Sequence, residues 1–134
     1  MAFHQFLRAA IQEKEIRVYG DGSQTRDFTF VSDAVDATLS ALKQSGLEGE
    51  TFNIGGGERV SLRDALRLIE AVAGKRIHLT YEEGQKGDMR DTHADISKAR
   101  EMLSYKPHTP LREGLRLEYE WLLPNLQEGE GTGS

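Results

Sequence analysis

Apolar residues recur at helical spacing in five stretches of this chain, and the intervals between them hold only short apolar runs. The pattern predicts helices over about residues 3–11, 32–44, 61–74, 97–103 and 109–122. Short strands are predicted at residues 16–19, 51–54 and 77–81. The second helix is expected to turn an apolar stripe inward, formed by Val31, Val35, Leu39 and Leu42. The alternation of strands and helices predicts an α/β protein.

Capping residues indicate where two of these helices begin and end. Ser32 or Asp33 is expected to cap the second helix. Ser61 and Asp64 have the spacing of a capping box at the start of the third helix. Gly74 is expected to end that third helix.

The predicted strands are too few to pair fully with one another. The run Thr51-Phe52-Asn53-Ile54 is apolar and flanked by helices, as expected for a strand buried in a parallel sheet. An unpaired strand exposes its backbone N–H and C=O groups, so the sheet is expected to be incomplete within this chain. Pairing of the strand in a homodimer, or with a separate chain, is an open alternative.

One arginine stands on the stretch that joins the first strand to the second helix. Gly20-Asp21-Gly22 predicts a tight turn after Tyr19, because glycine tolerates the positive φ that such turns need. Arg26 follows on a short loop, where its guanidinium could fork onto a phosphate. The alternative is an ion pair with Asp21, Asp27 or Asp33. Tyr19 could stack on a flat ring or pack in the core.

Composition excludes several classes of function. The formal net charge of −5 argues against a general nucleic-acid partner or an acidic membrane surface. Cysteine is absent, which excludes disulfides and thiolate metal sites. The four histidines show no metal-ligand spacing, so no metal site is expected. A weak divalent site at Asp91, His93 and Asp95 is the alternative. A cytoplasmic location is the default expectation.

Two further segments have both a functional and a structural interpretation. Gly55-Gly56-Gly57 precedes a helix, but its spacing fits neither the dinucleotide fingerprint nor the lysine-containing phosphate loop. Close backbone packing is therefore the favoured interpretation. In the charged run from Gln85 to Asp91, Asp88 could bind ribose hydroxyls and Arg90 could reach a phosphate. A solvated loop is the alternative for this run.

Several motifs occur together in a fixed order: GDGSQTRDFTFVSDAVDA (20–37), FNIGGGERVSLRDAL (52–66), KGDMRDTHADISKAREML (86–103), YKP (105–107) and TPLREGL (109–115). Together they resemble the C-terminal part of extended short-chain dehydrogenase/reductase enzymes, in particular NAD-dependent nucleotide-sugar epimerases and dehydratases of the UDP-glucose 4-epimerase type. The resemblance implies that residues 1–123 are the substrate-binding portion of an extended Rossmann-type enzyme and bind a UDP- or dTDP-sugar. Residues 124–134, beyond the last helix, are expected to be a disordered tail.

The resemblance also implies roles for individual residues. Arg26 would grip the nucleotide diphosphate, and Arg17 and Tyr19 would line the base pocket. Asp88 matches the aspartate of the family's Arg-Pro-Gly-Asp segment, which contacts the nucleotide. The arginine of that segment is replaced by Gln85, so Lys86 or Arg90 would have to supply the missing charge.

Other family features are absent from the chain. No Gly-rich NAD loop is present, and no tyrosine is followed four residues later by lysine: Tyr19, Tyr81, Tyr105 and Tyr119 are followed by Ser23, Gln85, Thr109 and Leu123. We therefore expect NAD in a full-length parent and none bound to this chain alone, which would be inactive by itself. On this interpretation the chain is a fragment and works with an NAD-binding half. A stand-alone, non-catalytic binding or regulatory module is the alternative.

Overall fold

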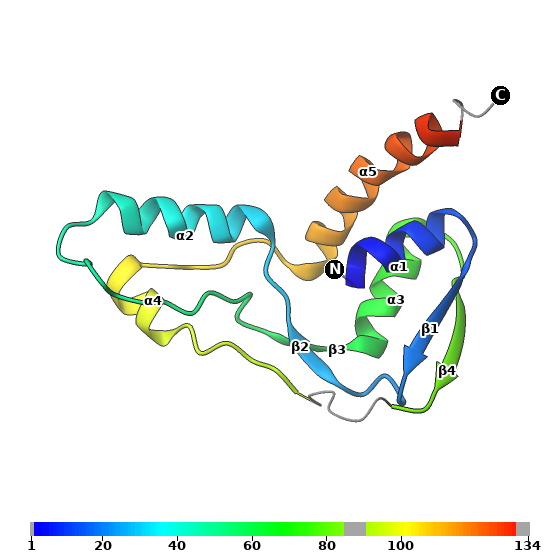
Figure 1. The fold of residues 1–134 in the computed structure, drawn as a ribbon, viewed down its shortest axis with the longest axis horizontal. Helices are drawn as coiled ribbons and strands as arrows, with labels where there is room; N and C mark the ends of the chain where they lie inside the picture. Colours follow the sequence, from blue (N-terminus) through cyan, green and yellow to red (C-terminus); the bar gives the residue numbers. More distant parts are fainter. Residues whose placement is uncertain (1, 85–90, 131–134) are drawn as a thin grey trace.

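The computed structural model describes residues 2–84 and 91–130, which form five helices and two small sheets (Figure 1). This arrangement confirms the α/β class, the five helices and the incomplete sheet. In chain order the elements are α1 (Ala2–Ile11), β1 (Glu15–Tyr19), β2 (Thr25–Asp27), α2 (Val31–Lys43), β3 (Arg59–Ser61), α3 (Leu62–Ala73), β4 (His78–Glu82), α4 (Ser97–Leu103) and α5 (Leu111–Glu130).

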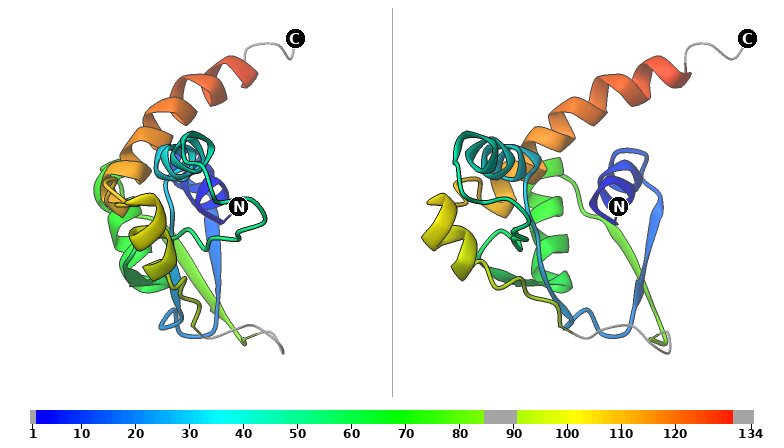
Figure 2. Two further views of the ribbon diagram at one scale, coloured as in Figure 1. Left: turned by 90° about the vertical axis from the view of Figure 1, so that its left-hand side faces the viewer. Right: turned by 60° about the vertical axis from the view of Figure 1, so that its left-hand side comes forward.

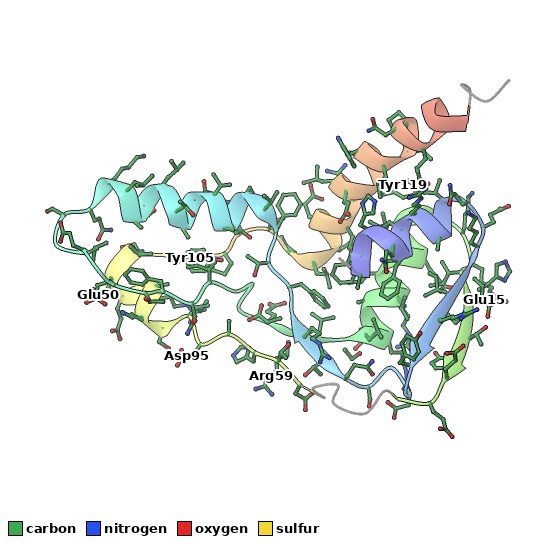
Figure 3. The ribbon with its side chains drawn as sticks, viewed as in Figure 1. Glu15, Glu50, Arg59, Asp95, Tyr105 and Tyr119 are labelled. Atoms are coloured by element: carbon green, nitrogen blue, oxygen red, sulfur yellow. The ribbon has the colours of Figure 1, made fainter. Side chains whose placement is uncertain are left out.

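The elements gather into two lobes joined by extended chain (Figures 1 and 2). The larger lobe holds α1, α3, β1, β4 and the start of α5, around a core that includes Leu7, Val18, Ile69 and Leu115. The smaller lobe packs α2 on α4, and its core includes Ala37, Ala99 and Leu103. Tyr105 lies between these two helices (Figure 3), and its hydroxyl donates to the Gly55 carbonyl at 2.7 Å.

The first sheet pairs β1 with β4 in parallel, with Glu15 opposite His78 and Tyr19 opposite Glu82. Burial alternates along β1: Ile16 and Val18 face the core, while Arg17 and Tyr19 point to the other side. Both strands therefore end at the same edge of the sheet, at Tyr19 and Glu82.

The second sheet was not predicted. Residues 25–27 form β2 rather than a loop and pair antiparallel with β3, with Arg26 opposite Val60. The predicted strand at 51–54 is wrong, since these residues carry no strand pairing. A strand needs a neighbour for its backbone hydrogen bonds, and no described segment of the chain lies beside 51–54 as one. A short polar run such as Thr-Arg-Asp carries no alternation that would have identified β2.

Helix α2 turns the opposite face inward from the one predicted. Val31, Val35, Leu39 and Leu42 are 67%, 49%, 44% and 76% exposed. The face with the smaller side chain of Ala37 packs on α4 instead. Neither Ser32 nor Asp33 caps this helix: the N-cap is Phe30, without a side-chain hydrogen bond. The spacing of apolar residues predicted the helix correctly. Which face of the helix is buried depends on the elements that pack against it.

The remaining helix ends differ less from expectation. Ser61 accepts a hydrogen bond from the Asp64 N–H at 3.1 Å, and Gly74 ends α3 with φ of 64°, so both predictions are confirmed. Helix α5 continues through Pro124 to Glu130, so residues 124–130 are helical where a disordered tail was expected. Extending a helix that has already formed fixes few further dihedrals for each bond gained. No helix of the described chain is both long and apolar enough to cross a membrane.

Candidate functional site

Arg26 lies on the central segment of three that run side by side. On one side β2 pairs with β3, and on the other Thr25 bridges to Asp91. The Thr25 hydroxyl donates to the Asp91 carboxylate at 2.6 Å, and the Thr92 N–H donates to the Thr25 carbonyl at 3.1 Å. The arginine is therefore carried by a strand that is held from both edges, which restricts where its guanidinium can reach.

The next residue, Asp27, is a buried anchor for this strand. Its carboxylate is 5% exposed and accepts hydrogen bonds from the Gly56 N–H at 2.6 Å and the Ala94 N–H at 3.3 Å. His93 Nδ1 lies 3.5 Å from the same carboxylate. Asp27 thus joins β2 to two segments that are distant in sequence. Its neighbour Arg26 is half-buried, and its Nη1 donates to the Thr25 carbonyl at 2.8 Å.

The first two of the three glycines after residue 54 pack against this anchor. A Cβ on Gly55 would lie 2.6 Å from an Asp27 carboxylate oxygen, and a Cβ on Gly56 would lie 2.0 Å from the Phe28 carbonyl oxygen. Gly57 adopts φ of 81°. The structural interpretation of the triple glycine is confirmed, because these residues allow close backbone approach. The described residues offer no phosphate-binding loop for NAD at this turn.

Tyr19 and Arg17 lie on the outward face of β1. Tyr19 is 37% exposed, so it is not a core residue. Arg17 is exposed, and its Nε lies 3.8 Å from the Glu82 carboxylate. The Gln24 side chain donates to the Tyr19 carbonyl at 3.1 Å, which closes the predicted turn, and Gly20 and Gly22 both have positive φ. The turn therefore connects Tyr19 with the strand that carries Arg26.

Gln85, Asp88 and Arg90 lie outside the described residues. The residues that flank them are described: Gly84 lies against the turn after β1, and Asp91 lies against the start of β2. Gly84 follows β4 and lies against Gly20, with the Gly20 Cα 4.0 Å from where a Gly84 Cβ would be. Asp91 bridges to Thr25. The structure thus brings the end of β1, the end of β4 and the start of β2 close together. This is the carboxyl edge of the parallel pair (Figure 2), the kind of edge at which α/β sheets bind ligands.

The weak divalent site at Asp91, His93 and Asp95 does not form. These side chains take separate partners: Thr25, Asp27 and Ser97. Hydrogen bonds from Ser97 lower the pKa of Asp95. Among the residues that the structure describes, three metal-ligating atoms come within 4.8 Å of one another only at Asp33, Asp36 and His108. The hydrogen bonds within that group account for its proximity.

Sequence reasoning missed Asp27 and Asp91 as parts of the site. In the run Arg26-Asp27 both side chains are charged, and the sequence does not say which one is buried. Of the three acids suggested as partners of Arg26, Asp27 and Asp33 have carboxylates that accept hydrogen bonds from backbone N–H groups. A buried acid that accepts two backbone donors leaves no periodic signal.

An apolar groove of about 400 Å³ lies away from these residues, between the start of α2 and α5. Its lining includes Phe30, Val31, Pro110, Leu117 and Trp121. Trp121 is 61% exposed and continues the exposed stripe of α2 through Val31. The groove has the character of a surface that another apolar surface would cover.

The fold is that of the C-terminal part of an extended Rossmann-type enzyme. Residues 1–55 match the NAD dependent epimerase/dehydratase family. An uncharacterised UDP-glucose epimerase, YtcB, of Bacillus subtilis is 42% identical over 97% of this chain. A UDP-glucuronate 4-epimerase of Thermodesulfobacterium geofontis is 34% identical over 95% of it. The chain belongs to the family of NAD-dependent nucleotide-sugar epimerases and dehydratases and is similar to their C-terminal part.

Solved structures agree with this assignment. The UDP-glucuronic acid 4-epimerase of Bacillus cereus, in complex with UDP-glucuronic acid and NAD, superposes with a TM-score of 0.87 at 37% identity and covers 94% of this chain. The UDP-glucose 4-epimerase of Thermotoga maritima, with UDP-glucose, gives a TM-score of 0.87 at 31% identity. This chain spans 41% of the length of YtcB and 40% of that of the Bacillus cereus enzyme.

Proposed function

We propose that this chain is the nucleotide-sugar-binding portion of an NAD-dependent epimerase or dehydratase of the UDP-glucose 4-epimerase type. The observation that carries the proposal is the position of Arg26. The residue stands on a strand anchored by Asp27 and Asp91, beside the carboxyl edge where β1 and β4 both end. Relatives with this fold are described with UDP-glucuronic acid or UDP-glucose bound.

In this proposal the guanidinium of Arg26 binds the diphosphate of a UDP- or dTDP-sugar, because a planar fork of donors suits two phosphate oxygens. Tyr19 offers an exposed ring on which the base can stack, and Arg17 lies on the same face of β1. Asp88 would bind the ribose, and Arg90 would replace the charge that Gln85 lacks. Holding the nucleotide in this way would position the sugar for chemistry elsewhere.

The glycine turn is filled by Asp27 and the backbone of Phe28, so we place no NAD there. We therefore assign no catalytic step to this chain and propose that it works in the cytoplasm with an NAD-binding portion. A stand-alone binding module remains the competing proposal, and the absence of a Tyr-x-x-x-Lys pair in the sequence is compatible with it.

The exposed apolar face of α2 supports the proposal that an NAD-binding portion packs on this chain. Four large apolar side chains lie in one stripe along the helix, and the apolar groove beside Trp121 continues it. The chain exposes 9156 Å², whereas a compact protein of 15.0 kDa exposes about 7,000 Å². Segment 51–54 also has the residue composition of a strand, but no described strand pairs with it. We propose that the NAD-binding portion covers this face, and a homodimer is the competing occupant.

Binding of UDP and of uridine distinguishes the proposed role of Arg26 from a general effect. The chain, its Arg26→Ala variant and an Arg67→Ala control are titrated with each ligand by calorimetry or NMR. Arg67 has the same charge and is an exposed residue of α3 in a surface pair with Asp64. Arg26→Ala should weaken UDP binding by roughly 10- to 100-fold and leave uridine binding unchanged, while Arg67→Ala should change neither. Equal affinities of the Arg26→Ala variant and the parent chain for UDP would contradict the proposal.

A further inference from the structure

A histidine bridges two acids at the junction of the two lobes. His108 lies on the segment between α4 and α5, and both of its ring nitrogens face carboxylates of α2. Nδ1 lies 3.0 Å from Asp33 Oδ1, and Nε2 lies 3.0 Å from Asp36 Oδ2. Nδ1 is also 3.1 Å from the Thr109 hydroxyl oxygen.

Asp33 is the fixed side of this bridge. It is only 1% exposed, and its two carboxylate oxygens accept hydrogen bonds from the backbone N–H groups of His108 and Thr109, both at 3.2 Å. Those bonds hold the segment before α5 against the start of α2 whether or not the imidazole is charged. Asp36 is the adjustable side, because it is 58% exposed and its bond with His108 is accessible to water.

The protonation state of the ring decides how many of these contacts can form. An imidazolium carries two N–H donors and satisfies Asp33 and Asp36 together. A neutral ring has one N–H, so at least one nitrogen lone pair must face a carboxylate oxygen at 3.0 Å. We propose that His108 is a pH-sensitive latch that joins α2 to the start of α5, tightest when the ring is protonated and loosened when it is neutral.

The two carboxylates act in the same direction. The hydrogen bond with Asp36 and the charge of Asp33 raise the pKa of His108 above its ordinary value. Glu58, from the segment before β3, lines the same small groove as His108, and Lys106 precedes it by two residues. Because the pKa is higher in the folded chain, the contribution of the latch to stability is complete below about pH 6.5 and is lost as the pH rises through the folded-state pKa.

The latch connects segments that line the apolar groove. Thr109 and Pro110 follow His108 directly and line that groove together with Val31 at the start of α2. The latch therefore adds a protonation-dependent contact between the two walls of the groove, beside the backbone hydrogen bonds to Asp33 that join them in either state. The inference does not depend on any nucleotide, since it concerns only residues of this chain.

NMR titration of the imidazole rings, in the folded chain and in urea, tests the latch. His108 should bind its proton more tightly in the folded chain than in urea. Asp36→Asn should move the pKa of His108 toward its value in urea. Equal pKa values in both states, or a His108 pKa that Asp36→Asn does not change, would overturn the proposal.

The variant His108→Gln adds a second readout. Urea unfolding at pH 6 and pH 9 should show the parent chain more stable than the variant at pH 6, with a smaller difference at pH 9. A difference that does not depend on pH would show that the ring contributes packing alone and would refute the latch. Should this variant not fold, the Asp36→Asn titration decides the question, since that substitution removes a charge at an exposed position.

Discussion

Replacing Gly56 by alanine should disrupt the platform that holds Arg26. The added Cβ would lie 2.0 Å from the Phe28 carbonyl oxygen, 3.1 Å from the Phe28 carbonyl carbon and 3.2 Å from an Asp27 carboxylate oxygen. The first two atoms belong to the backbone, so rotation of a side chain cannot relieve the contact. Either β2 or the glycine turn must move.

The cost has two parts. Overpacking in a filled site typically costs about 1–3 kcal/mol. Movement of the turn would also lengthen the 2.6 Å hydrogen bond from the Gly56 N–H to the buried Asp27 carboxylate, and a buried acceptor that loses a donor costs about 1–3 kcal/mol. Since both parts arise from one displacement, we expect about 3 kcal/mol in all, a large share of the roughly 5–15 kcal/mol that stabilises a domain.

Urea or thermal unfolding, followed by circular dichroism, measures this cost. Gly84→Ala is the matched control, because its Cβ would meet nothing closer than 4.0 Å. Gly46→Ala isolates backbone strain, since Gly46 has φ of 81° and no atom within 4 Å of its would-be Cβ; it should cost about 1 kcal/mol. A Gly56→Ala variant as stable as Gly84→Ala would refute the close-packing argument.

Two further predictions concern a helix cap and the exposed stripe. Ser61→Ala removes the acceptor of the Asp64 N–H and should cost about 1 kcal/mol in urea unfolding, whereas Ser61→Thr keeps the hydroxyl and should retain most of the stability. An alanine variant with unchanged stability would contradict the cap. Leu39→Ser with Leu42→Ser should change the stability of this chain by less than about 1 kcal/mol, because both side chains are exposed. The same double substitution should weaken binding of this chain to a separately expressed NAD-binding portion of a relative. Unchanged binding would contradict the proposal that the NAD-binding portion covers this face of α2. A homodimer of this chain that the double substitution dissociates would contradict it as well.

The sequence predicted elements whose signal is local. Helix α3 is the clearest case, because its capping box, its apolar spacing and its terminal glycine all lie within one stretch. The turn after Tyr19 is another, since glycine at positive φ is a property of the residue itself. Five helices, the α/β class and the incomplete sheet followed from such signals.

Features that depend on a distant neighbour were missed. The inward face of α2 was assigned by side-chain size, but α4 contacts the side with Ala37, and the large residues remain outside. The segment 51–54 has the composition of a strand without a neighbour to pair with. In the sequence, Asp27 and Asp33 look like ordinary surface acids. In the structure each carboxylate is buried and accepts a hydrogen bond from a backbone N–H more than 25 residues away. The residue pattern alone specifies none of these partners.

The residues of the candidate site fall into the same two groups, those that the sequence pointed to and those that depend on distant contacts. Arg26 and Tyr19 were proposed from the residue pattern and Arg17 through the resemblance, and the structure places them on two consecutive strands, β1 and β2, joined by one turn. Their roles toward a ligand stay predictions. The residues that fix the geometry, Asp27 and Asp91, act through contacts between segments, so only the fold revealed them.

Mapping UDP onto the chain by amide and arginine side-chain NMR shifts tests the account most directly. We predict that saturating UDP perturbs the Arg26 Nε–H signal together with the amides of Tyr19 to Asp27, and that Arg26→Ala abolishes these shifts. Shifts confined to the apolar groove around Trp121 and Leu117, with Arg26 unperturbed, would contradict the account.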